Sequence, residues 1–417
     1  MHRRTRLFSV AVAATTVILV TGCGGRGGET EGAATTSGDV KVDFGVTDDT
    51  IHLAALTDST GPYAALGSAA TQGNQAAIAA VNKAGGVCDR ELDLEVRDHG
   101  YNAQNAVAQY SQVAPDVVGL VQVVGGAMVS AIEGQAAADD MLLMSPSGEP
   151  PLLNKPNVML VGSTYDIEVI NGLSWLMSEG KLEAGDTIGH IYVDGGYGQP
   201  ALLGSKFMAE QHDLKLVEQA VEPTATDLTS QVLALKKAGV DAVAISTGPA
   251  AVGSAVGVAA AQGLDVPFVT GMPGWSSALL DTPARDALVK NLFVAQNFLA
   301  FADDKEIAKD LRAEFPDAPI TIPTSLGYAA VRVFVEALEQ ACENGDLTRQ
   351  GLVEAFRSLE SSDSGGHSVE NDYTILDKSP SRDSFVLGVD PDVDGGLTTL
   401  TKTPYTADAD IAAYYKE

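Results

Sequence analysis

The sequence contains little cysteine, few aromatic residues and few basic residues. Cysteine occurs three times in 417 residues, and aromatic residues make up 6% of the chain. Lysine and arginine total 26 against 55 aspartates and glutamates, which gives a net charge of −29. This charge argues against nucleic acid as a partner, because phosphate backbones are bound by basic patches. It also argues against a broad attraction to anionic membrane surfaces.

Motifs for catalysis and for metal binding are also scarce. There is no Gly-x-Ser-x-Gly elbow, and the six histidines form no His-x-x-x-His pair. His190 lies in a predicted strand, so we interpret it as a packed core residue and not as a base. Asp390, Asp392 and Asp394 copy half of a calcium loop, but Thr401 stands where a bidentate glutamate is needed, which predicts an acidic turn between strands. We expect no enzymatic activity, no cofactor and no metal.

The N-terminus has the pattern of an export signal. Three arginines precede an apolar run over residues 7–20, which is shorter than a membrane-spanning helix. Cys23 follows small residues directly, and this resembles the lipobox of bacterial lipoproteins, in which the cysteine receives lipid. The alternative is an ordinary cleaved signal with an accidental cysteine. We expect a lipoprotein signal peptide over residues 1–22, lipid on Cys23, and a flexible tether over residues 23–40.

The other two cysteines, Cys88 and Cys342, are far apart in the sequence. In an oxidising compartment such a pair can form a disulfide. Two separate buried thiols are the alternative. Both remain open at this point, because pairing depends on their separation in space.

Strand–loop–helix units repeat along the chain from about Val46. The predicted strands are 51–56, 92–96, 117–124, 141–144, 187–193, 214–221, 242–246, 266–270 and 292–295. The predicted helices are 68–83 (capped by Ser68), 102–113, 128–138, 167–177, 201–211, 227–238, 250–262, 325–343 and 348–359, followed by short strands and turns from about 369. This alternation predicts an α/β fold with parallel sheets covered by helices on both faces. The units are too many for one sheet, so we predict two doubly wound lobes.

Loops after the carboxyl ends of strands hold ligands in sheets of this kind. Here these loops carry hydroxyl groups, backbone amides and a few aromatic side chains. The candidate ligand-binding residues are Ser59, Tyr63, Gly125, Gly126, Ala127, Ser147, Gly148, Glu149, Tyr197, Thr247, Gly248, Met272 and Trp275. This chemistry predicts a small polar ligand bound by backbone amides and hydroxyls.

Three of these candidates have a plainer alternative. Tyr197, between glycines, is either a lid over the ligand or an ordinary loop aromatic. Trp275 either stacks on a ligand or packs at the edge of a lobe. Glu149 is either a ligand contact or a solvated loop carboxylate.

Five stretches occur in an order and at a spacing that are fairly specific together. They are 50–53 leading to Thr60-Gly61-Pro62 and Gly67, 81–87, 145–149, 194–198 and 326–330. Over nearly the whole chain after the signal, they resemble the branched-chain amino-acid (leucine/isoleucine/valine-type) binding family of ABC-transporter receptors. The resemblance implies a type I periplasmic binding fold with two discontinuous lobes joined by a three-strand hinge.

The resemblance also implies boundaries and roles. Lobe 1 would comprise 41–162 plus 298–369, and lobe 2 would comprise 163–297 plus 370–417, with crossings near Gly162, Asn297 and Val369. Gly125, Gly126 and Ala127 would bind the ligand carboxylate, Ser147 and Glu149 would line lobe 1, and Tyr197 would close from lobe 2.

The chain departs from the family pattern at four positions. The aromatic residue of the first cleft loop is Leu66 here, and the aromatic expected after Ser246 falls on Gly248 or Pro249. The acidic residue of the second lobe, which pairs with the ligand ammonium, falls on Pro273. Glu149 stands where the family has a hydroxyl. Glu149 either replaces the lost ammonium partner or indicates a ligand that is not an α-amino acid.

The function that the resemblance implies is an extracytoplasmic solute-binding lipoprotein of an ABC importer. It would bind a branched-chain amino acid, or a related amino acid, amide or small acid, and close on it. The implied partners are an ABC permease and its ATPase, with the lipid as membrane anchor and the receptor as a monomer. The alternatives are a receptor for a signalling partner and an exported hydrolase.

Overall fold

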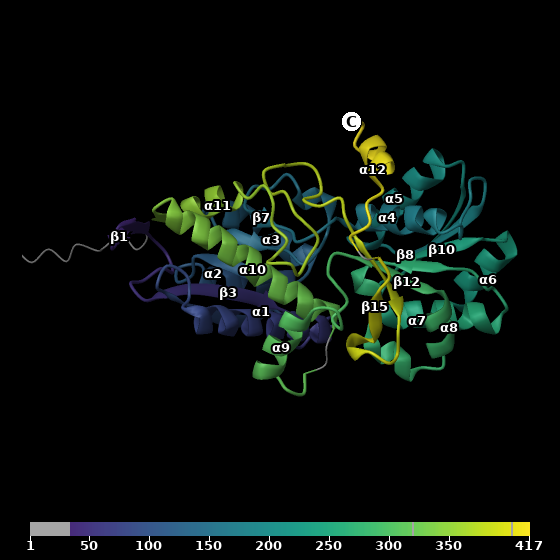
Figure 1. Ribbon diagram of the computed structural model, residues 1–417, viewed down its shortest axis with the longest axis horizontal. Coiled ribbons are helices and arrows are strands. Elements are labelled where there is room, and N and C mark those ends of the chain that lie inside the picture. Colours follow the sequence, from purple (N-terminus) through teal and green to yellow (C-terminus); the bar gives the residue numbers. More distant parts are fainter. Residues whose placement is uncertain (1–33, 319–320, 402) are drawn as a thin grey trace, which may run out of the picture.

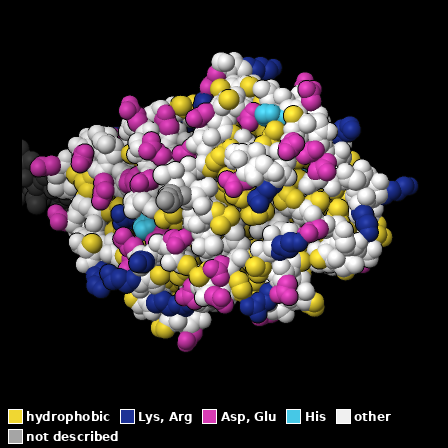
Figure 2. Space-filling view, turned by 45° about the vertical axis from the view of Figure 1, so that its right-hand side comes forward, with side chains coloured by type: hydrophobic (Ala, Val, Ile, Leu, Met, Phe, Trp, Pro, Cys, Tyr) yellow, Lys and Arg dark blue, Asp and Glu magenta, His cyan; other side chains and the backbone are white. Residues whose placement is uncertain are grey.

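The computed structural model describes residues 34–318, 321–401 and 403–417, which form two α/β lobes side by side (Figure 1). The predicted signal peptide and Cys23 lie outside the described residues. Acidic side chains are spread over the face that Figure 2 shows, interspersed with basic ones. None of the helices within the described ranges combines the length and the apolar character that a membrane crossing requires.

Lobe 1 is built on a parallel five-stranded sheet in the order β4-β3-β5-β6-β7. Its strands are β3 (Thr50–Thr57), β4 (Glu91–Asp98), β5 (Gly119–Val123), β6 (Leu142–Met144) and β7 (Val158–Met159). Its helices are α1 (Ala64–Ala84), α2 (Ala103–Val113), α3 (Gly126–Ala138), α9 (Lys305–Glu314), α10 (Ile322–Glu343) and α11 (Arg349–Phe356).

Successive residues of β3 face opposite layers of helices, as the period of a strand requires. Ile51 and Leu53 belong to the core cluster that contains α1 and α10. Ala54 and Leu56 belong to a separate cluster with α2 and α3. Helices therefore cover both faces of this sheet, which confirms the doubly wound prediction.

Lobe 2 is built on a seven-stranded sheet in the order β15-β14-β12-β11-β10-β8-β9. Its strands are β8 (Thr187–Val193), β9 (Lys215–Val221), β10 (Ala242–Ser246), β11 (Phe268–Thr270), β12 (Leu292–Gln296), β14 (Phe385–Val389) and β15 (Leu397–Thr399). Its helices are α4 (Tyr165–Ser178), α5 (Gly198–Gln211), α6 (Thr229–Ala238), α7 (Pro249–Ala261), α8 (Arg285–Asn291) and α12 (Asp408–Tyr414). The strands from β9 to β12 are parallel, and β14 and β15 complete the sheet antiparallel.

The structure differs from the sequence prediction at several element ends. β1 (Thr35–Ser37) lies within the predicted tether over residues 23–40, and β2 (Val40–Val42) begins at the last residue of that tether. Both strands form a small sheet with β13 (Asp346–Leu347). The described fold therefore begins before Val46, because Val42 is buried against lobe 1. Ser68 lies inside α1 and does not cap it, since α1 begins after Tyr63.

Other sequence interpretations are confirmed. The acidic residues from Asp390 form a turn between β14 and β15, with the Asp392 amide donating to the Asp390 carboxylate. His190 is fully buried in β8. Cys88 and Cys342 form a disulfide with Cα atoms 6.5 Å apart, which decides between the bridge and two free thiols.

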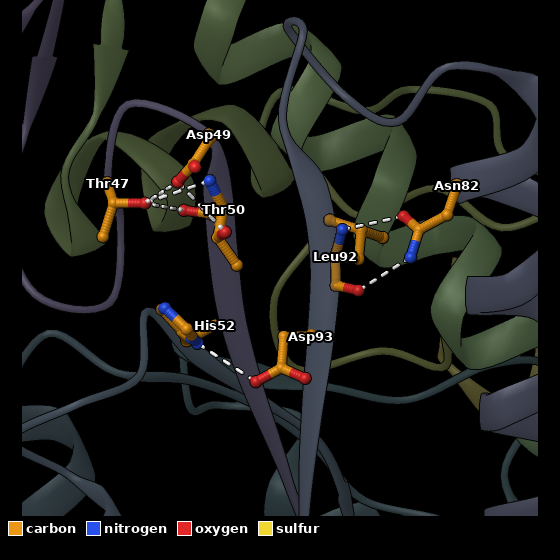
Figure 3. Close-up of polar contacts among 7 residues, drawn as sticks. All are labelled: Thr47, Asp49, Thr50, His52, Asn82, Leu92 and Asp93. Atoms are coloured by element: carbon orange, nitrogen blue, oxygen red, sulfur yellow. Dashed lines mark hydrogen bonds and ion pairs between the residues drawn. The ribbon is translucent and has the colours of Figure 1, made fainter.

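The junction between α1 and β4 gives a structural role to the asparagine in the last turn of α1. The Asn82 side chain donates to the Leu92 carbonyl and accepts from the Leu92 amide, both at 2.8 Å (Figure 3). One planar amide thus binds a strand residue twice and fixes the helix end against the sheet. On the neighbouring strand His52 contacts Asp93 at 3.2 Å (Figure 3).

Candidate functional site

The chain segments that pass between the lobes meet at three residues. The Val369 amide donates to the Asn297 carbonyl at 2.8 Å, and Phe298 and Ser368 form an antiparallel bridge beside them. Gly162 has φ +96°, and a Cβ there would lie 2.2 Å from Cγ of Asn297. Only glycine fits this close approach without strain.

Asn297 is the hydrogen-bonding centre of this crossing. Its Oδ1 accepts from the amide of Ser163 at 2.9 Å and from the Ser163 hydroxyl at 2.7 Å. Its Nδ2 donates to the Ser163 carbonyl at 3.1 Å and to Oε1 of Glu168 at 3.0 Å. All three residues are buried, so one side chain connects the strand leaving lobe 2 with the first turn of α4.

A cavity of about 20 Å³ lies at the junction, with room for about one water molecule. Residues of both lobes and of the crossings line it: Ser145, Pro146, Gly148, Leu160, Val161, Ser163, Tyr165, Glu168, Met272, Asn297, Phe298 and Leu326. None of these lining residues is lysine or arginine. A ligand of several atoms therefore needs the lobes to move apart, and it would meet acidic and hydroxyl groups but no cation from this set.

Glu168 is the one acidic residue among those that line the cavity. Its side chain is 2% exposed, and among the described residues its Oε2 has no hydrogen-bond partner. Burial raises the pKa of Glu168 well above its ordinary value, and the neighbouring Asp166 raises it further, while the bond from Asn297 acts in the opposite direction. Burial therefore favours the neutral form of this acid, and a positive group beside it would favour the ionised form.

Two tyrosines of lobe 2 pack beside Glu168. The rings of Tyr165 and Tyr197 meet edge to face, with centroids 4.7 Å apart. The Tyr197 hydroxyl is buried and finds no partner within the described ranges. A Cβ built on Gly271 would lie 2.5 Å from Oε2 of Glu168 and 3.2 Å from the Tyr197 hydroxyl, so both oxygens border the same point of backbone.

Glu149 lies where the two lobes touch. A Cβ on Gly126, at the start of α3, would lie 1.8 Å from Oε1 of Glu149, and a Cβ on Gly196 of lobe 2 would lie 2.5 Å from the same oxygen. The carboxylate therefore lies against backbone from both lobes, at the N-terminal end of a helix that favours negative charge. Burial raises the pKa of Glu149.

The first cleft loop is shaped by two aspartates. Asp58 accepts from the amides of Gly61 and Tyr63 at 2.6 and 2.8 Å. Asp98 accepts from the Ser59 amide at 3.0 Å. Burial acts to raise the pKa of Asp98, but hydrogen bonds from this loop outweigh it and lower the pKa to about 2. Tyr63 is 40% exposed.

The structure brings some of the predicted residues together and separates others. Gly148 and Met272 line the cavity, Gly126 and Glu149 lie at the contact between the lobes, and Tyr197 packs against Tyr165 within lobe 2. Gly125 and Ala127 flank Gly126 at the start of α3, Ser147 adjoins Gly148, and Ser59 and Tyr63 lie in the first loop. Thr247 and Gly248 precede α7 and are not among the cavity-lining residues. Trp275 is buried and donates to the Gly395 carbonyl at 3.1 Å, which favours packing at the lobe edge over stacking on a ligand.

Sequence reasoning missed Glu168 and Tyr165, and it named Asn297 only as the place of a crossing between the lobes. One available signal was the pair of carboxylates in the run Tyr165-Asp-Ile-Glu-Val-Ile, since acidic side chains are rarely buried without a partner or a role.

These features define a two-lobed α/β protein with a cavity that residues of both lobes line. A family model described as periplasmic binding protein matches residues 50–396. The chain therefore belongs to the periplasmic binding protein family, among the solute-binding proteins of ABC transporters, which confirms the resemblance seen in the sequence.

Individual relatives differ in the ligands that their names state. A leucine-, isoleucine-, valine-, threonine- and alanine-binding protein of Pseudomonas aeruginosa is 27% identical over 319 residues, covering 74% of this chain and 83% of that protein. A fatty acid ABC transporter substrate-binding protein from Thermomonospora curvata is 37% identical with a TM-score of 0.83, covering 89% and 96%. A branched-chain amino acid ABC transporter protein from Thermus thermophilus with bound valine is 17% identical with a TM-score of 0.76, covering 88% and 99%, and shows the fold alone.

Proposed function

We propose that this protein is the extracytoplasmic receptor of an ABC importer and that it binds a small amino acid in the cleft between its lobes. The observation that carries the proposal is the cavity at the crossing, which both lobes line and which contains a buried carboxylate but no basic side chain. An amino acid offers an ammonium group to this carboxylate and a carboxylate to the start of α3. The ligand contacts both lobes and therefore favours the closed arrangement.

The position of Glu149 supports this orientation of the ligand. Its carboxylate lies against Gly126 at the N-terminal end of α3, where the resemblance places the ligand carboxylate. We interpret Glu149 as occupying that position until a ligand carboxylate displaces it. This replaces the hypothesis in which Glu149 receives the ligand ammonium.

The anchor and the partners complete the proposal. Lipid on Cys23 would hold the receptor at the outer surface of the cell membrane, and a permease with its ATPase would accept the closed, monomeric form. The mass of Cys23→Ser protein compared with that of the membrane-extracted wild type tests the lipid directly. A signalling receptor would use the same binding step but a different membrane partner.

A second ligand class has one specific observation in its favour. The Thermomonospora curvata relative, 37% identical, is a fatty acid receptor by its printed name. Either ligand would bring a third carboxyl group to a cleft that already holds Glu149 and Glu168, but a fatty acid lacks the ammonium group that offsets this charge, and no cavity-lining residue is lysine or arginine. We therefore place amino acids first.

Calorimetry on purified protein tests the ligand class. The panel comprises leucine, valine, threonine and alanine, the amide of leucine, and fatty acids of increasing length. We expect an amino acid to bind and to stabilise the fold by about 2.7 kcal/mol at one hundred times its dissociation constant. Binding of a fatty acid with no response to any amino acid would transfer the proposal to the second class.

A further inference from the structure

Two oxygens from different elements of lobe 2 face the same point beside the cavity. Oε2 of Glu168 comes from α4, and the Tyr197 hydroxyl comes from the turn before α5. Among the described residues neither oxygen has a partner in good hydrogen-bonding geometry, although Thr270, Ser246 and the Gly271 amide lie near the Tyr197 hydroxyl, and both oxygens border the backbone of Gly271. Buried polar atoms are normally hydrogen-bonded, so this pair needs an explanation. A group that only donates hydrogen bonds, such as an ammonium, would satisfy both oxygens.

We propose that Glu168 and Tyr197 form a cation-binding site at the floor of the cleft, which receives the ammonium group of the ligand. This inference rests on the proposed function and adds the chemical class of the ligand: amines and amino acids bind more tightly than acids or neutral amides. It assigns the role to α4, although the family pattern places the acidic partner at Pro273 in the loop after β11.

The charges around Glu168 favour a cation. Glu168 is close to Asp166 and Tyr165 of its own helix. Tyr197 faces it from the turn before α5, and Glu149 lies across the cleft. None of these groups is positive. An ionised carboxylate in this position would be buried without compensation, which is costly. An approaching ammonium allows Glu168 to ionise, and the proton of the carboxyl group then passes to the solvent.

The same carboxylate is connected to the crossing between the lobes. Oε1 of Glu168 accepts from Asn297, which also holds Ser163 through three hydrogen bonds. Ionisation of Glu168 converts the bond from Asn297 into a charge-assisted one, and such bonds are roughly twice as strong as neutral ones. Binding of the cation therefore strengthens the contact at the crossing when the lobes close.

Two other roles for Glu168 give different experimental results. In the first, it only stabilises the first turn of α4 through the helix dipole. In the second, it is a protonated acid that donates to a ligand carboxylate. A glutamine at this position still donates, so it would keep the second role and lose the binding of a cation.

Calorimetry with three probes separates these roles. The probes are L-leucine, 3-methylbutylamine, which lacks the carboxylate, and 4-methylpentanoate, which lacks the ammonium. We expect Glu168→Gln to lower the affinity for leucine and for the amine by at least about 30-fold. The affinity for the acid should stay within about threefold of the wild-type value. Titration of the wild type in buffers of different ionisation enthalpy should show proton release that the variant lacks. The matched control is Asp166→Asn, because Asp166 is a buried carboxylate of the same helix that accepts from Tyr414 and does not line the cavity.

Each contrary result has a distinct meaning. Amine affinity within about threefold of wild type in Glu168→Gln, or an equal loss for amine and acid, overturns the cation site and leaves the proposed receptor function intact. If Glu168→Gln does not fold, Tyr197→Phe replaces it, and unchanged amine affinity there overturns the proposal equally. A wild-type protein that binds the acid but neither leucine nor the amine contradicts the amino-acid ligand itself.

Discussion

Replacing Asn297 with alanine tests whether one amide holds the crossing between the lobes. The substitution removes four hydrogen bonds of 2.7 to 3.1 Å and leaves the Ser163 backbone and Oε1 of Glu168 buried without these partners. A buried polar group without a partner costs about 1–3 kcal/mol. Water entering the adjacent cavity can satisfy part of this set, so we expect the free energy of unfolding to fall by about 3–5 kcal/mol.

Asn82→Ala is the matched control for this prediction. It removes a side-chain amide that also bonds twice to backbone, but within lobe 1 and partly exposed (Figure 3). We expect urea denaturation to show a free energy of unfolding that is lower by about 1–2 kcal/mol, and we expect no change in leucine affinity. Asn297→Ala should also weaken the binding of leucine, because the crossing must keep its geometry when the lobes close. Equal effects of the two variants on stability and on binding would refute the role of Asn297 at the crossing.

The disulfide and Glu149 give two further predictions. Replacing Cys88 and Cys342 with alanine opens a loop closed over 254 residues, and we expect calorimetry to show about 2–4 kcal/mol less stability, whereas an unchanged melting temperature would contradict this. Burial raises the pKa of Glu149 above 4.5, so its buried contact is most stable when protonated and weakens as the pH rises through the raised pKa. Glu149→Gln should remove this loss of stability, which sets in as the pH rises above about 4.5. The variant should also bind 4-methylpentanoate more tightly, and weaker binding of this acid would count against our interpretation.

The alternation of strands and helices could be predicted because buried parallel strands are short apolar runs with clear turn residues between them. Most of the elements that were missed lack this signal. α8 and α12 are seven residues long, too short for a helical period to separate them from loops. α9 did carry a signal, because Asp304 caps it and the buried Ile307 and Leu311 are four residues apart, but sequence reasoning overlooked it. β1 and β2 are three residues each and are ordered through pairing with β13, about 300 residues later. Such contacts are absent from any local window of sequence.

The loops of the site were predictable, but the buried charge was not. Every residue from Tyr165 to Gly172 on α4 is buried, because the sheet, α5, α12 and the crossing surround this end of the helix. A helix without a wet face has no amphipathic pattern, so the sequence does not show which of its two acids points to the cleft. Asp166 turns towards Tyr414, whereas Glu168 turns towards Asn297.

The departure at Pro273 and the presence of Glu168 are explained together by their positions in space. Pro273 follows Met272, which lines the same cavity as Glu168. A comparison made position by position along the sequence therefore finds that the acidic residue after β11 is missing. It does not find the carboxylate of Glu168, which lies on α4 over one hundred positions earlier. We infer that the negative charge of the second lobe is retained in the cleft but is supplied by another element. Because α4 begins at the crossing and the loop after β11 does not, this relocation places the cation-binding group next to the residues that join the lobes.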